Sequence, residues 1–297
     1  MQGCLRRQHT KINDMTTCYF VSDLHGSISR YELLFREMIR NKPSFVFLGG
    51  DLLPHIHRSA RLKGENIPDF ASDFLIPGFK KVRSQLGCNY PEVFVIMGND
   101  DHRVEEPKFV EAAEKELWTY LNTSSFKFGP YTIYGYPFVP PTPFLLKDWE
   151  KYDISNAVST GSLPPDAGFR TVDSDDTSAA TIAEDLEKLT ADADMSKAVF
   201  LFHSPPYQSL LDQAEVGKPV SSPLHVGSKA ILNFIRERQP YLTMHGHIHE
   251  SARLSGHWQQ KFGRTQAFNA AHDGFGLSII QFQIDNPDLA QRIILDD

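Results

Sequence analysis

The chain has 297 residues, of which 41% are hydrophobic and 23% charged, and its formal net charge is −7. This length suffices for one large α/β domain or two small ones, and the composition is that of a globular protein. The acidic balance argues against bulk binding to nucleic acid or anionic membranes, because such proteins usually carry a basic excess. No apolar run approaches the ~18 residues that suggest a membrane span. We therefore expect neither a membrane nor a nucleic-acid partner.

The cysteines and the first residues of the chain bear on its location. Three cysteines are scattered without a CxxC spacing, so they indicate neither a disulfide framework nor a thiolate zinc site. A reducing, cytoplasmic setting fits this usage best. Residues 1–14 contain basic residues but no apolar region of a signal peptide. We expect them to be a disordered leader, and residues 15–297 to form a single domain.

Short apolar runs, each followed by a cluster of polar residues, recur along the chain. Five of these runs are rich in β-branched or aromatic residues and apolar on both faces, which is typical of buried strands. They are residues 18–21, 44–48, 93–97, 198–202 and 241–244. Between them, helical spacing of apolar residues occurs at 29–40, 109–121, 177–190 and 228–237. Ser29 and Ser228 are the expected N-caps of the first and last of these helices.

Strands that alternate with helices predict βαβ units and a largely buried sheet. Later strand-like runs differ, because no long helix separates the last three of them. These runs are residues 131–136, 265–269, 277–284 and 292–295. We therefore expect a second, more antiparallel sheet. The fold class predicted is α/β, as a two-sheet β-sandwich flanked by helices.

Two stretches have the composition of insertions. One lies near residues 52–68, and the other, near 138–176, is rich in proline, aspartate, serine and threonine. Aromatic residues accompany the prolines of the second stretch, namely Tyr136, Phe138, Phe144 and Trp149. We expect these rings to pack the insertion against the sandwich, and the alternative is that they line a substrate wall.

The five buried runs share one further property, because each is followed by residues able to bind a metal ion. These residues are Asp23, His25, Asp51, Asn99, His203, His247 and His249. Loops at the carboxyl ends of strands build the active sites of open α/β sheets. We therefore expect the side chains to meet at one end of the sandwich.

Each of these residues, taken alone, has an ordinary structural explanation. Asp23 could cap a helix, Asp51 could sit in a turn, and His203 could be a buried histidine with satisfied hydrogen bonds. Together, at five strand ends, they predict a metal centre. Imidazole and carboxylate ligands suit manganese, iron or zinc better than calcium. A carboxylate such as Asp51 can bridge two ions, and ions roughly 3.5–4 Å apart can clamp the attacking and leaving oxygens of an in-line displacement.

In this order the motifs resemble those of the calcineurin-like metallophosphoesterases. The family signature is Asp-x-His, Gly-Asp, Gly-Asn-His-Asp/Glu, a lone His and Gly-His-x-His, and the likeness runs from Phe20 to His249. The resemblance implies a double β-sandwich flanked by helices, with two divalent or trivalent transition metal ions. It implies that one ion is held by Asp23, His25, Asp51 and His249. It implies that the other is held by Asp51, Asn99, His203 and His247.

One position departs from the family signature, because Asp100 stands where many members have a histidine. That histidine is usually assigned as the acid that assists the leaving group, so the proton source is open here. Asp100 could serve if its pKa were raised, and His102 lies two residues further on. Loop histidines are further candidates, although each could equally be a solvated side chain: His55, His57 and His225.

The resemblance predicts a metal-dependent phosphoesterase, and we favour a phosphodiesterase that acts on a small or nucleotide-type phosphate ester. One alternative is a nuclease of the same family, against which the acidic net charge and the lack of a basic stripe count. The other is a catalytically silent scaffold that uses the fold for protein–protein contact. Such relatives lose metal ligands, whereas all seven positions are filled in this chain. Salt-dependent retention on DNA tests the first alternative, and metal analysis tests the second.

Overall fold

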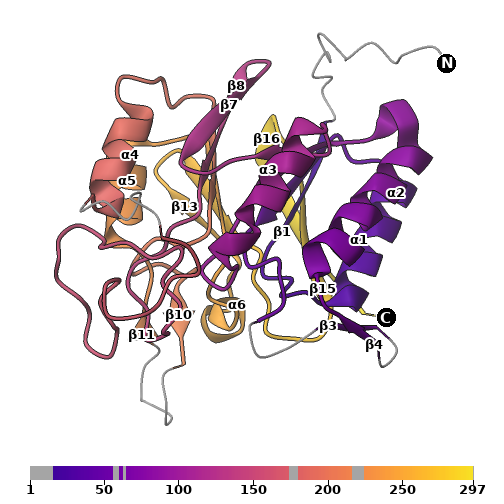
Figure 1. Cartoon of the computed structure of the whole chain (residues 1–297). Helices are drawn as coiled ribbons and strands as arrows, with labels where there is room; N and C mark the ends of the chain where they lie inside the picture. Colours follow the sequence, from indigo (N-terminus) through magenta and orange to yellow (C-terminus); the bar gives the residue numbers. More distant parts are fainter. Residues whose placement is uncertain (1–15, 56–59, 63–64, 174–179, 216–223, 297) are drawn as a thin grey trace.

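The computed structural model of the chain describes residues 16–55, 60–62, 65–173, 180–215 and 224–296. Two six-stranded sheets lie face to face at its centre, and helices cover their outer faces (Figure 1). The predicted α/β sandwich is therefore confirmed. The leader expected at 1–14 lies outside the described residues. Across the described ranges, no helix is both long enough and apolar enough to cross a membrane.

The first sheet contains three of the five predicted buried strands. Its strand order is β16-β15-β1-β2-β5-β6, in which β1, β2, β5 and β6 run parallel and β15 and β16 are added antiparallel at one edge. The bounds are β1 Thr17–Val21, β2 Phe45–Gly49, β5 Glu92–Ile96, β6 Thr119–Tyr120, β15 Leu277–Gln283 and β16 Asn286–Leu295.

The second sheet contains the other two predicted buried strands. Its order is β13-β14-β12-β9-β8-β7, with four parallel strands in the middle and an antiparallel strand at each edge. The bounds are β7 Ser124–Phe128, β8 Tyr131–Tyr136, β9 Ala198–Phe202, β12 Leu242–His245, β13 Gln259–Phe262 and β14 Thr265–Asn269.

The expectation that the late strands form a second, more antiparallel sheet is wrong in part. Strand β14 pairs parallel with β12 in the second sheet, whereas β15 and β16 extend the first sheet. Residues 270–276 carry the chain from one sheet to the other, and such a short connection without a helix is indistinguishable in sequence from a hairpin turn.

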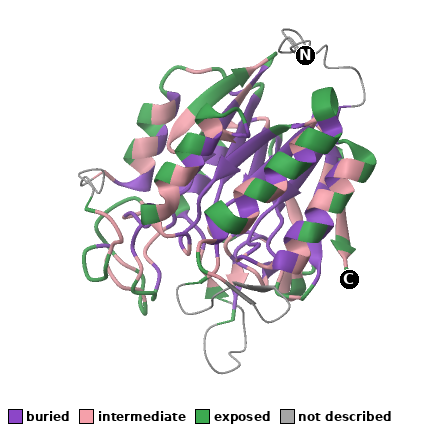
Figure 2. Cartoon of the chain, turned by 45° about the vertical axis from the view of Figure 1, so that its right-hand side comes forward, coloured by how far each residue is buried: buried purple, intermediate pink, exposed green. Residues whose placement is uncertain are grey.

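Helices cover the outer faces of the sandwich, and their exposed sides face solvent (Figure 2). In Figure 1, α1, α2 and α3 lie on one side and α4 and α5 on the other. Their bounds, with the short helical segments, are α1 Ile28–Asn41, η1 Ala71–Leu75, α2 Ile76–Leu86, η2 Gly87–Asn89, η3 Arg103–Glu105, α3 Glu106–Glu114, α4 Ile182–Thr190, α5 Lys229–Arg238 and α6 Ser251–Ser255. Two small hairpins complete the described elements: β3 Ala60–Leu62 with β4 Glu65–Ile67, and β10 Gln213–Ala214 with β11 Leu224–His225.

The helices differ from the sequence expectation in three ways. Ser27, not Ser29, occupies the N-cap position of α1, whereas Ser228 caps α5 as predicted and accepts a hydrogen bond from Ile231 N at 3.0 Å. Helix α3, which was predicted to reach residue 121, ends at Glu114. Glu116 takes a left-handed φ of 58°, and the residues after it join the first sheet as β6. Helix α2 was not predicted.

Alternate residues of the buried strands belong to two different cores. Phe20, Phe47 and Phe94 lie in a cluster between the two sheets, together with residues of β9, β12 and β14. Their neighbours Tyr19 and Val46 pack instead in the cluster that includes the helices. Both faces of these strands are therefore buried, which explains their continuous apolar sequences. Because one cluster joins the two sheets, we propose that residues 15–297 form a single domain.

Within the described part of the second insertion, residues 138–173, most of the buried side chains lie in 138–151, and many of residues 152–173 are exposed. Trp149 is fully buried, and its Nε1 donates a hydrogen bond to the carbonyl of Asp101 at 2.8 Å. Tyr136 and Phe138 are also buried, whereas Phe144 is 55% exposed. The predicted packing is confirmed for three of the four aromatic residues, and it ties the insertion to the loop that follows β5.

A buried ion pair holds this insertion together. Lys147 is fully buried, and its Nζ donates to Glu150 Oε2 at 2.7 Å and to the Thr142 carbonyl at 2.9 Å. Burial raises the pKa of Glu150 above its usual value, against the opposing effect of the hydrogen bonds from Lys147 and Thr142. The carboxylate therefore depends on Lys147 to remain charged.

Replacing Lys147 with methionine should lower the free energy of unfolding by about 3–5 kcal/mol, because it leaves a buried carboxylate without its partner. Denaturant-induced unfolding measures this change. The matched control is Lys261→Met, which removes the exposed pair with Asp288 and should cost less than about 1 kcal/mol. Equal effects of the two substitutions would contradict the expected role of Lys147.

Candidate metal centre

The turns after β1 and β2 lie side by side and are joined through their backbones. Asp23 N donates to the Gly50 carbonyl at 3.0 Å, and His25 N donates to the Asp51 carbonyl at 2.8 Å. Because β1 and β2 are adjacent and parallel, their carboxyl ends meet at the same edge of the sheet. This pairing brings Asp23, His25 and Asp51 together.

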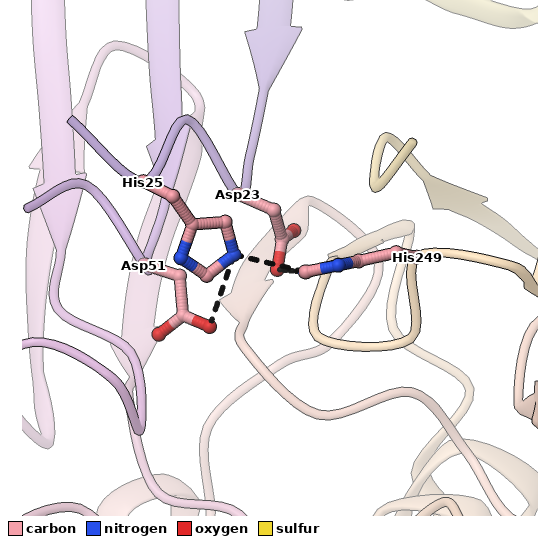
Figure 3. A group of neighbouring side chains, drawn as sticks. All are labelled: Asp23, His25, Asp51 and His249. Carbon is pink, nitrogen blue, oxygen red and sulfur yellow. Dashed lines mark hydrogen bonds and ion pairs between the residues drawn. The ribbon is translucent and has the colours of Figure 1, made fainter. Parts of the chain in front are cut away.

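His249, from the turn after β12, completes a first group of candidate ligands with Asp23, His25 and Asp51 (Figure 3). One ligand-type atom from each residue lies within 4.8 Å of the other three. Nε2 of His25 is 2.9 Å from Nε2 of His249 and 3.8 Å from Oδ2 of Asp51. Nε2 of His249 is also 3.1 Å from Oδ1 of Asp23. Imidazole nitrogens and carboxylate oxygens that converge in this way suit a transition metal ion.

A second group consists of Asp51, His203 and His247. Nε2 of His203 lies 3.3 Å from Oδ2 of Asp51 and 3.1 Å from Oδ1 of Asn99. The same oxygen of Asp51 thus faces His25 in the first group and His203 in the second. The structure therefore gathers all seven predicted ligands, with Asp51 placed between the two groups.

The protonation of the histidines fits a metal centre. Nδ1 of His203 is 2.8 Å from the Gly49 carbonyl, so this nitrogen carries the proton and Nε2 is left as a possible ligand. In His25, the buried Nδ1 has no hydrogen-bond partner, while Nε2 points at the other candidate ligands. The residues present therefore fit two transition metal ions.

The backbone is strained where these ligands sit. Asp23, His25, Asp51 and His247 have φ values of 59°, 45°, 52° and 70°, in the left-handed region that residues other than glycine rarely adopt. Such conformations persist where surrounding structure over-determines them, and they cluster at functional sites. Nothing in the sequence pattern indicates this strain.

Two glycines allow the ligand loops to approach one another. A Cβ at Gly98 would lie 2.3 Å from Oδ1 of Asp51, and one at Gly50 would lie 2.7 Å from Nδ1 of His203. Gly50 also has a φ of 93°. A larger residue at either position would displace a candidate ligand. Both positions therefore require glycine, because the ligand side chains lie against the backbone there.

Negative charge accumulates in this site. Burial, with the nearby charge of Asp51, raises the pKa of Asp100 to about 8 and that of Asp101 to about 7. Burial by itself would lower the pKa of His203, but Asp51 raises it to about 10. Without bound cations, protons on these groups offset the carboxylate charge. Cations at the two groups would favour the ionised carboxylates and replace those protons.

Asp101 supports the site through hydrogen bonds, although the sequence pattern alone did not single it out. It is fully buried, and its Oδ1 accepts hydrogen bonds from the N–H groups of Leu52 and Leu53 at 2.8 and 2.7 Å. Its Oδ2 accepts from Gly98 N at 2.9 Å. Asp101 therefore fastens the loop that carries Asn99 to the turn that carries Asp51. The signal was present, because Asp101 fills the last, acidic position of the third motif.

Two of the candidate proton sources lie beside the first group. Oδ2 of Asp100 is 3.8 Å from Nδ1 of His25 and 3.3 Å from Nδ1 of His55. The ring of His55 stacks on that of His25, with centroids 4.6 Å apart and planes inclined by 7°. His55 therefore approaches the centre, although nothing in the sequence favours it over the other loop histidines.

The other candidates are placed differently. Nε2 of His102 is buried without a hydrogen-bond partner, and His102 belongs to none of the groups of candidate ligands among the described residues. His225 is paired through Nδ1 with Oδ1 of Asp212 at 2.7 Å, in the β10–β11 hairpin. His57 lies outside the described residues.

Known proteins share this architecture. The model of a family described as calcineurin-like phosphoesterase matches residues 16–251. The TT1561 protein of Thermus thermophilus has a TM-score of 0.53 at 12% identity, over 94% of this chain and 99% of that one. A dimetal phosphatase from Danio rerio has a TM-score of 0.49 at 12% identity, over 96% of this chain and 100% of its own. No curated protein sequence matches the chain.

The family match extends over most of the chain and includes every predicted metal ligand. The likeness to TT1561 shows a common fold and nothing further, because the sequence identity is low. From the family match, this chain belongs to the calcineurin-like phosphoesterase family and is a metal-dependent phosphoester hydrolase.

Proposed function

We propose that the chain is a phosphodiesterase that hydrolyses a small or nucleotide-type phosphate ester at a centre of two transition metal ions. The observation that carries this proposal is the position of Asp51, whose Oδ2 faces His25 on one side and His203 on the other. One ion would be held by Asp23, His25, Asp51 and His249. The other would be held by Asp51, Asn99, His203 and His247.

The chain's own side chains are arranged for this chemistry. When bound, the ions would supply Lewis-acid stabilisation of the phosphoryl oxygens. Asp51 is placed to screen the mutual repulsion of two cations, and the Gly49 carbonyl holds the His203 ring in orientation. Hydrogen bonds to Asp101 hold the loop of Asn99 against the turn of Asp51. Manganese, iron and zinc all suit this mixed nitrogen and oxygen ligand set.

A diester substrate fits the site better than a monoester. Asp100 adds a carboxyl group beside the first group of ligands, at the position where many members of the family have a histidine. With cations bound and Asp100 ionised, a doubly charged monoester would meet more repulsion than a singly charged diester. The same replacement removes an imidazole that could protonate a poor leaving group. The repulsion favours diesters over monoesters, and the missing imidazole favours substrates with good leaving groups.

The proposed activity is tested by a panel of phosphomonoesters, phosphodiesters and cyclic nucleotides, assayed with manganese, iron and zinc. We expect turnover to be highest with diesters. Faster hydrolysis of monoesters under every metal condition would refute the diester preference. Cleavage of duplex DNA that weakens steeply with salt would favour the nuclease alternative instead.

Reconstituted protein should bind close to two equivalents of transition metal per chain, because seven candidate ligands form two groups joined by Asp51. Elemental analysis after dialysis against manganese or iron measures this ratio. Protein that retains no metal under these conditions would contradict the dinuclear centre, and would support the scaffold alternative.

Asp51→Asn should reduce kcat more than His249→Ala does, because Asp51 is expected to contact both ions and His249 only one. Loss of several kcal/mol of transition-state stabilisation corresponds to a decrease of roughly 10³-fold or more. Both variants should remain folded, since the strands that present these residues are apolar and buried. Wild-type turnover and full metal occupancy in Asp51→Asn would disprove the shared-ligand assignment.

The rate should depend steeply on the pKa of the leaving group, because no strong acid is assigned to the leaving-group oxygen. General acid catalysis typically contributes ~10²–10⁴-fold, and alkoxide leaving groups need it most. A series of substituted phenyl and alkyl phosphodiesters measures this slope in the wild type and in His102→Ala. We expect only a small loss in the variant with aryl substrates. Severe loss with alkyl esters alone would identify His102 as the acid.

A further inference from the structure

The Asp100 carboxyl group contacts side chains on three sides. Its Oδ1 accepts a hydrogen bond from Nδ2 of Asn99 at 3.0 Å. Its Oδ2 lies 3.3 Å from Nδ1 of His55 and 3.8 Å from Nδ1 of His25. A proposed ligand of each ion, Asn99 for one and His25 for the other, thus lies next to the same carboxyl group.

His25 lacks the partner that a metal-binding histidine normally has. Its Nε2 faces His249 and Asp51, which leaves Nδ1 to carry the proton once Nε2 is a ligand. That Nδ1 is buried and has no hydrogen-bond partner. Oδ2 of Asp100 is a carboxylate oxygen close enough to accept from it after a small rotation of either side chain. Metal-binding histidines usually donate this second N–H to a carboxylate or carbonyl.

His55 also lies against Asp100, with its Nδ1 3.3 Å from Oδ2 of Asp100. Its ring is stacked nearly parallel on that of His25, so the two rings present the same nitrogen to the same carboxylate oxygen. The His55 side chain is 43% exposed, whereas that of His25 is 14% exposed. His55 therefore covers His25 at the solvent-facing rim of the first group.

The contact with Asn99 fixes which end of its amide faces the site. Because Nδ2 donates to Asp100, Oδ1 is directed to the other side, where it lies 3.1 Å from Nε2 of His203. An amide oxygen can be a metal ligand, whereas the amide NH₂ group is a donor only. Asp100 thus selects the orientation of Asn99 that can bind an ion.

From these contacts we infer that Asp100 is a positioning residue for the metal centre. It orients His25 and Asn99, one proposed ligand of each ion, and holds His55 against His25. In this chain an aspartate replaces the histidine of the family motif, and its carboxylate contacts the ligands on the side away from the ions. This inference rests on the proposed function, because it assumes that His25 and Asn99 hold metal ions.

The test measures manganese affinity of the metal-free protein by isothermal titration, for the wild type, Asp100→Ala, Asp100→Asn and His55→Ala. Loss of an outer carboxylate partner typically costs 10–100-fold in metal affinity, and we expect about that loss in Asp100→Ala. Asp100→Asn keeps an oxygen acceptor and should lose less. His55→Ala should lose little, because His55 is not a ligand. The matched control is His225→Ala, which breaks a histidine–carboxylate pair outside the centre and should bind manganese like the wild type.

A second readout separates positioning from acid catalysis. At saturating manganese, kcat of Asp100→Ala should recover to within about tenfold of the wild type, whereas loss of a general acid would leave a deficit of ~10²–10⁴-fold with alkyl diesters. Thermal melting of each variant checks that the fold is intact, and Asp100→Asn carries the test if Asp100→Ala does not fold.

The outcomes distinguish this inference from the proposed function. Wild-type protein that binds no manganese would overturn both. Two equivalents bound with equal affinity by the wild type and Asp100→Ala would overturn the role of Asp100 and leave the dinuclear centre standing. A third equivalent that disappears in His55→Ala would also overturn it, because His25, His55 and Asp100 would then form a metal site of their own.

Discussion

The buried carboxylate of Asp51 is the group on which the rest of the site depends. It is almost completely inaccessible to solvent, and two histidines from different sheets approach the same oxygen. Burial by itself raises the pKa of Asp51, but the neighbouring His203 and His25 lower it well below its usual range. A charge so stabilised must be surrounded by positive groups, whether protonated rings or metal ions. The two groups of ligands are therefore linked electrostatically as well as by geometry.

Holding that charge in place requires unusual backbone around it. The turns after β1 and β2 bond to each other through main-chain groups, and the residues that bear the ligands adopt left-handed φ values. Asp101 and Trp149 add contacts from the next loop and from the second insertion. The site is thus supported by segments from across the sequence. The packed core between the two sheets holds the ligand residues in their strained backbone conformations.

The sequence predicted the five buried strands and the residues that follow them, because continuous apolar runs and ligand-type residues are local features. It failed where the outcome depends on tertiary contacts. The change of sheet between β14 and β15, the early end of α3 and the left-handed φ of Asp23 have no local signal. The stacking of His55 on His25 was also hidden, since a loop histidine looks alike whether solvated or packed. Asp101 could have been found from the acidic end of its motif.

Each group of candidate ligands takes residues from both sheets, and this has a consequence for how the chain folds. His249 follows Asp23 by 226 positions, so the first group cannot close until nearly the whole family region has been synthesised. Contacts between such distant segments form slowly, because the intervening chain must first be brought together. Both sheets must therefore be assembled before either group of ligands is complete. A metal ion held by either group would then connect segments that lie far apart in the sequence and belong to different sheets.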